Sequence, residues 1–239
     1  MGVSVILYFM KKNAMNQSII ILLFCGVWIF LGCNRAKPTK EASAERELAS
    51  SAVSQNRDDR PVLVAFGDSL TSGLGVDPDK NYPAKLQKKI DAEGYRYRVV
   101  NAGASGDTSD QGLNRIQSVI DLHPVIAIVE LGANDGLRGL PAEVTRQNLA
   151  AIVQRLQSAG IKVVLAGMQV PPNYGPQYTN EFRNIFMDIA KQYGIPLIPF
   201  FLDGVGGVPS LNQDDGIHPT ADGYDIVVNN VWRVLKPLL

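Results

Sequence analysis

The feature that most limits the fold is a regular alternation of short apolar runs with segments of helical periodicity. The run at 62–66 is apolar throughout, as expected of a strand buried on both faces of a sheet. Later runs repeat this pattern at 97–100, 125–131, 161–166 and 195–198. Between them, apolar residues recur at the spacing of one helix face, for example over 149–156 and 224–235. This alternation predicts an α/β fold, a three-layer α/β/α sandwich around a mainly parallel five-stranded sheet.

Residues 1–33 have the composition of an export signal. Lys11 and Lys12 precede an uncharged, apolar stretch at 18–32. This stretch is shorter than the roughly 20 residues that a membrane-spanning helix needs. A basic start followed by such a short run is typical of a secretory signal. The sequence therefore predicts export to the periplasm or the cell envelope.

Cys33 directly follows a glycine at the end of the apolar stretch, and this ending resembles a bacterial lipobox. In such a signal the cysteine is lipidated and becomes the mature N-terminus, which would attach the protein to a membrane. A plain signal peptide and an uncleaved anchor are the alternatives, because Phe30 and Leu31 depart from the usual lipobox residues. Met10 and Met15 are alternative start sites, since Met10 stands directly before the two lysines.

Between residues 34 and 60 the composition changes to Ala, Ser, Glu, Lys, Arg and Asp, with almost no large apolar side chain. Such a segment cannot bury enough surface to offset the entropy lost on ordering. We therefore expect a flexible polar linker at 34–60. The folded domain is expected at 61–239, which is long enough to bury a core of its own.

Charge and cysteine content argue against two classes of protein. The chain carries 23 basic and 23 acidic residues, so it lacks the cationic excess of a nucleic-acid-binding protein. Its cysteines, Cys25 and Cys33, both precede the expected domain, and its histidines are His123 and His218. These residues are too few for the usual four-ligand structural zinc site, so we expect no metal.

Polar segments containing glycine stand where ligand sites form in such folds, beyond the carboxyl ends of the strands. Three of them follow the first three expected strands, namely GDSLTSG at 67–73, NAGASGDT at 101–108 and GANDG at 132–136. The fourth, DDGIHP at 214–219, precedes the C-terminal helix. Together and in this order they resemble the GDSL or SGNH hydrolase superfamily. Within it they are most similar to the bacterial periplasmic acyl-CoA thioesterase and lysophospholipase group and the related arylesterases. The resemblance implies a flavodoxin-like sheet and a serine hydrolase that needs no cofactor.

Ser69 is the candidate nucleophile, because the buried strand before it would fix its backbone. A serine hydroxyl needs a base within hydrogen-bond reach. His123 falls at the amino end of an expected strand, on the wrong side of the sheet, whereas His218 lies in the loop before the last helix. Asp215 precedes His218 by three residues, so its carboxylate could hold Nδ1 while Nε2 faces Ser69. The alternative is that Ser69 and His218 only cap helices.

Acyl transfer also requires donors for the negative charge that develops on the substrate oxygen. The candidates for this oxyanion hole are the backbone N–H of Ser69, the N–H of Gly106 and the side-chain amide of Asn134. Gly103 competes with Gly106, and the resemblance to the family's glycine donor selects Gly106. Asp68, beside the nucleophile, is interpreted as a carboxylate that organises the loop.

Residues 168–175 follow the fourth expected strand and, by resemblance, border an acyl pocket in which Met168, Pro172 and Tyr174 bind substrate. We therefore expect an enzyme that hydrolyses short- to medium-chain acyl esters, acyl thioesters or lysophospholipids through an acyl-enzyme intermediate. We also expect a monomer, although no sequence pattern bears on the oligomeric state. A carbohydrate acetylesterase is the alternative enzyme. A non-catalytic envelope lipoprotein that binds ligands on the same fold is the alternative from a different class. A nucleotide-binding flavodoxin-like protein is disfavoured, because the phosphate-binding glycine loops are missing.

Overall fold

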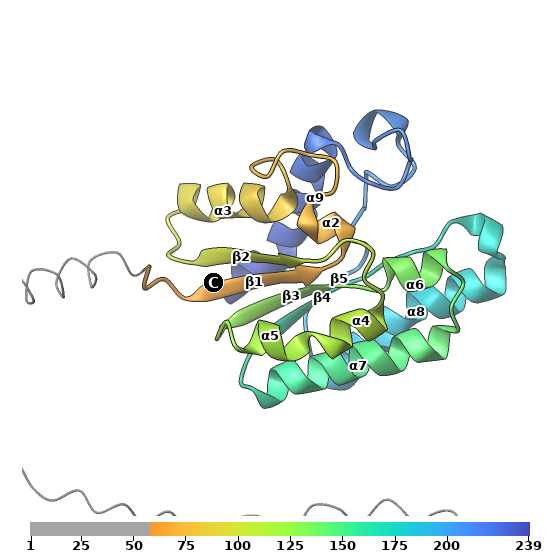
Figure 1. Cartoon of the computed structure of the whole chain (residues 1–239), viewed down its shortest axis with the longest axis horizontal. Coiled ribbons are helices and arrows are strands. Elements are labelled where there is room, and N and C mark those ends of the chain that lie inside the picture. The colour runs from red at the N-terminus through yellow and green to blue at the C-terminus, as the bar shows by residue number, and fades with distance from the viewer. Residues whose placement is uncertain (1–57) are drawn as a thin grey trace, which may run out of the picture. The chain divides into compact units, whose positions relative to one another are not determined.

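The structure is a computed structural model that describes residues 58–239 (Figure 1). The expected export signal at 1–33, with Cys33, lies outside the described residues. The same holds for residues 34–57 of the expected linker. Among the residues that the structure describes, no helix is both long enough and apolar enough to cross a membrane.

Five parallel strands form one sheet in the order β2-β1-β3-β4-β5. Their bounds are β1 Val62–Gly67, β2 Arg98–Gly103, β3 Ile126–Glu130, β4 Lys162–Ala166 and β5 Leu197–Ile198. Each strand overlaps one of the expected apolar runs, so the predicted parallel sheet is confirmed. From β1 the chain adds β2 on one side and β3 on the other, which makes the β1–β3 boundary the switch point where ligand sites form in open α/β sheets.

Helices cover both faces of the sheet and complete the predicted three-layer sandwich (Figure 1). One face carries α3 Tyr82–Ala92 and α9 Ala221–Leu235. The other face carries α4 Ser109–Asn114, α5 Ile116–Ile120, α7 Ala142–Ser158 and α8 Pro176–Tyr193. Two short helices follow β1 and β3 directly, α2 Ser69–Ser72 and α6 Ala133–Leu137. Single 3₁₀ turns occur at η1 Pro172–Tyr174, η2 Pro209–Leu211 and η3 Lys236–Leu238.

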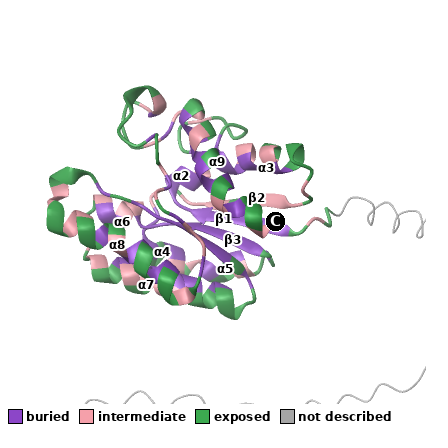
Figure 2. Cartoon of the chain, turned by 180° about the vertical axis from the view of Figure 1, so that it is seen from behind, coloured by how far each residue is buried: buried purple, intermediate pink, exposed green. Residues whose placement is uncertain are grey.

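The strands at the centre of the sheet are almost wholly buried, as the purple ribbon in Figure 2 shows. Every residue of β1 and β3 is buried. The ring of Tyr82 from α3 packs edge-to-face on that of Phe201, with centroids 5.2 Å apart. The apolar face predicted over 149–156 is the buried face of α7. This packing fixes the points at which β1 and β3 end.

The second strand is longer than its apolar run predicts. The prediction ends it at Val100, whereas β2 continues to Gly103 and pairs with β1 as far as Gly67. β2 is an edge strand and only half-buried, so the polar Asn101 is tolerated there. Part of the segment expected as a loop, residues 101–103, therefore belongs to the sheet.

The short helix α2 is held in place from three sides. A Cβ built on Gly103 would lie 2.2 Å from the backbone nitrogen of the last residue of α2, so only glycine allows β2 to approach this closely. Asp68 caps the helix, its Oδ1 accepting from Leu70 N at 2.9 Å. The hydroxyl of Tyr224 in α9 donates to Leu70 O at 3.0 Å. The residue that begins this fixed helix is Ser69.

Candidate active site

Three side chains from two distant segments form a hydrogen-bonded chain at the carboxyl ends of the strands. Ser69 Oγ lies 2.9 Å from His218 Nε2. His218 Nδ1 lies 2.6 Å from Asp215 Oδ2. When Nδ1–H donates to Asp215, Nε2 can accept the hydroxyl proton of Ser69. The structure thus brings together the nucleophile, the base and the orienting carboxylate expected from the sequence.

The carboxylate of Asp215 is fixed by the loop that carries it. Its Oδ1 accepts from the backbone nitrogens of Ile217 and His218, both at 3.0 Å, which turns Oδ2 toward the imidazole. These hydrogen bonds, that of the His218 side chain foremost, lower the pKa of Asp215 to about 2. Asp215 is therefore ionised at neutral pH and stabilises the proton on Nδ1.

The competing candidates lie elsewhere in the fold. His123 is exposed just before the amino end of β3, at the edge of the sheet opposite Ser69. Asp214 is exposed beside the orienting carboxylate. Gly103 ends β2 beneath α2, whereas Gly106 lines the cavity that Ser69 also lines. Of the two glycines, only Gly106 is placed to face a bound substrate.

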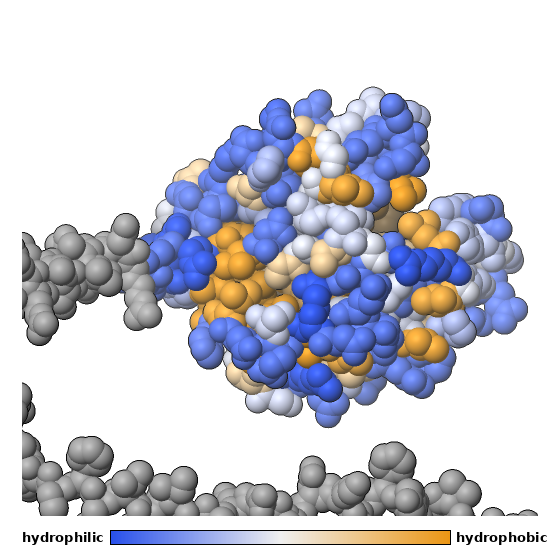
Figure 3. Space-filling model, viewed as in Figure 1, coloured by the Kyte–Doolittle hydropathy of each residue, from blue (hydrophilic) through white to orange (hydrophobic). Residues whose placement is uncertain are grey.

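A cavity of about 480 Å³ opens beside Ser69 and His218. Figure 3 shows hydrophobic residues on both sides of this hollow, at the right of the view. Its apolar lining comes mostly from the segments after α2, β4 and β5, namely Leu74, Met168, Val170, Pro171, Pro172, Phe200 and Leu202. The cavity therefore combines a polar end, where the hydrogen-bonded chain lies, with an apolar wall.

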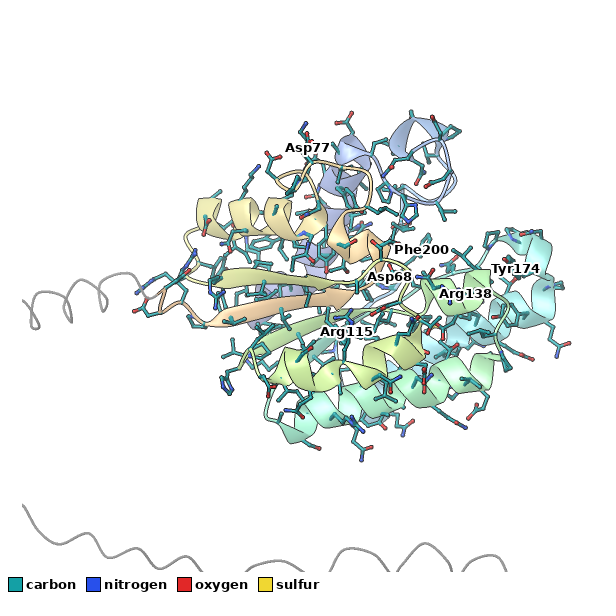
Figure 4. All side chains as sticks on the ribbon, in the orientation of Figure 1. Asp68, Asp77, Arg115, Arg138, Tyr174 and Phe200 are labelled. Carbon is teal, nitrogen blue, oxygen red and sulfur yellow. The ribbon has the colours of Figure 1, made fainter. Side chains whose placement is uncertain are left out.

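Two of the three residues expected to bind substrate line this cavity, Met168 and Pro172. Tyr174 is not part of the lining. Its hydroxyl donates to Leu137 O at 2.7 Å, and Figure 4 shows it well away from Asp68. Leu137 itself lines the cavity, so Tyr174 supports the wall from behind.

Asn134 lies in α6, directly after β3, and its amide is held by two acceptors. Its Nδ2 donates to Asp68 Oδ2 and to Asp107 O, both at 3.0 Å. Asn134 lines the cavity together with Ser69 and Gly106, so the three expected oxyanion donors face one space. Because both Nδ2 hydrogens already have acceptors, donation to a substrate oxygen requires the amide to share one of them.

Two buried carboxyl groups lie beneath Ser69, the candidate nucleophile. Asp68 is fully buried, and burial raises its pKa to about 6. Glu130, the last residue of β3, is also fully buried and accepts from Thr71 Oγ1 at 2.6 Å. Burial, together with the neighbouring Asp68, raises the pKa of Glu130. The sequence prediction assigned no role to Glu130, although a lone charge inside the apolar run 125–131 was the available signal.

Arg115 is a second residue that the sequence prediction missed. Its Nε donates to Asp107 Oδ2 at 2.6 Å, and its Nη atoms donate to Ala102 O and Gly67 O at 2.8 and 2.7 Å. The guanidinium lies 4.5 Å from the ring centroid of Phe66. Arg115, labelled in Figure 4, thus ties the ends of β1 and β2 to the loop that follows β2. A single cation at the end of a helix has no sequence pattern that would predict this role.

The sequence matches the GDSL-like Lipase/Acylhydrolase family over residues 65–226. The chain belongs to this family. The matched range contains all five residues of the triad and the oxyanion hole expected from the sequence, and the family resemblance is thereby confirmed.

Characterised relatives cover most of the described domain. The chain is 47% identical to the esterase TesA of Pseudomonas aeruginosa over 74% of this chain and 89% of that protein. It is 39% identical to thioesterase 1/protease 1/lysophospholipase L1 of Escherichia coli, over 74% of this chain and 84% of that protein. A crystal structure of TesA superposes with a TM-score of 0.73 and 46% identity, over 74% of this chain and 99% of that one. A crystal structure of the psychrotrophic esterase EstA from Pseudoalteromonas sp. superposes with a TM-score of 0.71 and 32% sequence identity. The match covers 74% of this chain and 97% of that one.

Replacing Asp68 by Asn should change how stability depends on pH. In the folded protein Asp68 keeps its proton up to about pH 6, whereas its ordinary pKa is 3.8. A carboxyl group whose pKa is raised by folding stabilises the folded protein at a pH below its ordinary pKa. This contribution is lost as the pH rises through the pKa of the folded protein. The wild-type free energy of unfolding should therefore fall by about 2 kcal/mol, relative to Asp68→Asn, between about pH 4 and pH 7. Urea unfolding at a series of pH values measures this difference.

Val164→Ala in β4 is the control, because it removes buried apolar volume and no titrating group. It should lower the free energy of unfolding by about 2 kcal/mol at every pH in the series. A difference between wild type and Asp68→Asn that stays flat with pH would contradict the buried, proton-retaining carboxyl.

Proposed function

We propose that this chain is a serine esterase and thioesterase acting on short- to medium-chain acyl esters, acyl thioesters or lysophospholipids. The observation that carries the proposal is the 2.9 Å contact of Ser69 Oγ with His218 Nε2 at the edge of an apolar cavity. The names of the relatives, esterase and thioesterase 1/protease 1/lysophospholipase L1, support the same class of reaction. The substrate is a small molecule with a carbonyl carbon that the serine can attack.

The reaction proceeds through a covalent acyl-enzyme. His218 Nε2 takes the hydroxyl proton as Ser69 Oγ attacks the carbonyl carbon, and Asp215 stabilises the imidazolium that forms. The tetrahedral intermediate then expels the alcohol or thiol, which leaves with the proton from His218. Water, deprotonated by the same imidazole, attacks the acyl-enzyme and releases a carboxylic acid and the free serine.

The proposed oxyanion hole consists of the N–H groups of Ser69 and Gly106 and the amide of Asn134. All three residues line the cavity on the side of the hydrogen-bonded chain. Donors fixed before the reaction stabilise the developing charge without reorganising, and one donor typically contributes about 10²–10³ in rate. The carboxyl of Asp68 and the carbonyl of Asp107 hold the Asn134 amide in place for this role.

The apolar wall supports an acyl chain as the part of the substrate that is buried. Each methylene transferred from water to such a surface contributes about 0.8 kcal/mol to binding. We propose that Met168 and Pro172 contact the chain, while Tyr174 acts indirectly by holding Leu137 in the cavity wall. A cavity of about 480 Å³ accommodates more than an acetyl group, which favours acyl chains over carbohydrate acetates.

Ser69→Ala should abolish hydrolysis of p-nitrophenyl esters while leaving the fold intact. Loss of the nucleophile should lower kcat by at least about 10³-fold, because the remaining groups cannot form an acyl-enzyme. A fluorophosphonate probe should label the wild type and not the variant. Ser158→Ala, at the exposed end of α7, is the matched control and should keep wild-type turnover and labelling. Wild-type turnover in Ser69→Ala would remove this residue from the mechanism.

The acyl cavity makes a second prediction, tested with p-nitrophenyl esters of increasing chain length. The wild-type kcat/KM should rise from acetate toward medium chains, and Leu202→Trp should lower the octanoate-to-acetate ratio about 10-fold by filling the cavity. Val208→Trp, at an exposed position outside the lining, should leave the ratio unchanged. Faster release of acetate from acetylated xylan than from any p-nitrophenyl ester would favour the carbohydrate acetylesterase instead. Ligand binding without any hydrolysis would favour the non-catalytic module.

We further propose that residues 1–33 direct export to the periplasm or cell envelope. Residues 34–60 would link this signal to the catalytic domain at 61–239, and the domain would act as a monomer. Lipidation of Cys33 would hold the enzyme at a bacterial membrane. Cells grown with radioactive palmitate should label the wild type and Cys25→Ser, but not Cys33→Ser, because only the lipobox-like cysteine becomes the mature N-terminus. Equal labelling in Cys33→Ser, or none in the wild type, contradicts this anchor.

A further inference from the structure

The side chain of Gln213 bridges the two segments that carry the nucleophile and the base. Its Nε2 donates to Leu74 O at 2.8 Å and to Pro219 O at 3.0 Å. Both hydrogens of the amide are therefore used, one toward each segment. Gln213 lies two residues before Asp215 and, although close to the site, is not part of the cavity lining.

The loop that carries Asp215 and His218 is closed on itself. Gln213 N donates to His218 O at 2.8 Å, and Gly216 N donates to Gln213 O at 2.9 Å. An antiparallel bridge joins Asn212 to Pro219 at the base of the loop. Since the bond of Asp215 to His218 also lies within the loop, the two can move together as one unit.

The other end of the bridge is attached to the nucleophile. Leu74 N donates to Ser69 O at 3.2 Å, so Leu74 follows the position of α2. Apart from the bond between Ser69 and His218, the contact of Gln213 with Leu74 is the one hydrogen bond that joins 69–76 to 211–220 in the described structure. It is thus placed to set how closely the loop approaches the helix.

Gly75 shows that the approach is tight. A Cβ built on it would lie 2.0 Å from Gln213 Oε1, so any side chain there would push the amide away. The backbone of Gly75 also has a φ of +79°, which favours glycine. The segment after α2 therefore accommodates Gln213 closely, and the amide has a defined position in it.

We propose that Gln213 is a positioning residue that sets the distance between Ser69 Oγ and His218 Nε2. The inference rests on the proposed function, because that distance matters only if the proton passes between these atoms. Proton transfer requires a separation of about 2.6–3.2 Å. A displacement of about 1 Å can cost about 10²-fold in rate.

Gln213→Ala tests this role in the full chain. The loop should move away from α2 as a unit, so kcat for p-nitrophenyl esters should fall about 10- to 100-fold while KM changes less than about threefold. The low-field proton resonance of His218 Nδ1, which reports the bond to Asp215, should persist. Gln213→Glu should show a similar loss at neutral pH, because a carboxylate cannot donate to Leu74 O. Gln147→Ala, at a glutamine that bonds Glu143 on the surface of α7, is the control and should keep wild-type kcat.

A double-mutant cycle with Gly75→Ala tests the contact from the other side. Gly75→Ala should lower kcat, because its new methyl group displaces the Gln213 amide. Once Gln213 is already Ala, the same change should cost much less, so the effects on kcat should be less than multiplicative. If the effects of the two substitutions on kcat multiply fully, Gly75→Ala acts through backbone strain alone. That result would contradict the close contact with Gln213 as the cause of the lower kcat.

The inference is overturned if Gln213→Ala keeps kcat within about twofold of wild type. It is also overturned if the variant loses activity together with the low-field resonance, since Gln213 would then maintain the loop itself. The proposed function fails separately, through a wild type that neither hydrolyses esters nor reacts with the fluorophosphonate. An active wild type with an unaffected Gln213→Ala rejects only the positioning role.

Discussion

The site depends on a single edge of a parallel sheet, where the carboxyl ends of β1 and β3 lie side by side. Parallel strands deliver the segments that follow them to the same edge, so residues distant in the chain meet there. Ser69 follows β1, Asn134 follows β3, and His218 reaches them from 149 positions after Ser69. Because β1 and β3 are wholly buried, their ends have little freedom to move. The proposed chemistry therefore rests on how the sheet packs more than on the residues next to any one catalytic group.

The same buried edge places two ionisable carboxyl groups close together beneath Ser69. Asp68 and Glu130 are both fully buried, and two neighbouring carboxyl groups in an apolar interior resist being ionised together. Asp68 accepts two N–H donors, one of them from Asn134, which favours its charged form. Glu130 Oε1 and the hydroxyl of Tyr82 are buried with no hydrogen-bond partner among the described residues. At neutral pH, which lies above the pKa of Asp68, the proton of the pair therefore belongs on Glu130, and the negative charge falls on Asp68, the carboxyl that orients the Asn134 amide.

The strands could be predicted from the sequence because each leaves a local pattern, whereas Ser69, Asp215 and His218 are expected to act together because four polar segments in order resemble one hydrolase family. Continuous apolar runs mark strands, and a carboxylate three residues before a histidine marks a loop that can pair them. The extension of β2 to Gly103 could not be read this way, since an edge strand tolerates the polar residues that usually indicate a loop. The family resemblance of its segment assigns Tyr174 to the acyl pocket, whereas in the structure its hydroxyl donates to Leu137 O behind the cavity wall. Arg115 and Gln213 act through backbone carbonyls of distant segments, and a carbonyl has no side-chain identity for a sequence pattern to detect.

The division of the cavity between elements has a consequence for how substrate range can change. The residues proposed to react come from the segments after β1, β2 and β3 and from the loop before α9, whereas most of the apolar wall comes from the segments after β4 and β5. We therefore expect substitutions at Met168 or Leu202 to reshape the proposed acyl pocket without moving Ser69 or His218. Leu74 has a place in both parts, because it lines the cavity and its carbonyl accepts from Gln213 Nε2. Under the proposed mechanism, an acyl chain that displaces Leu74 would also displace Gln213, and the fit of the substrate would then affect the distance between Ser69 and His218.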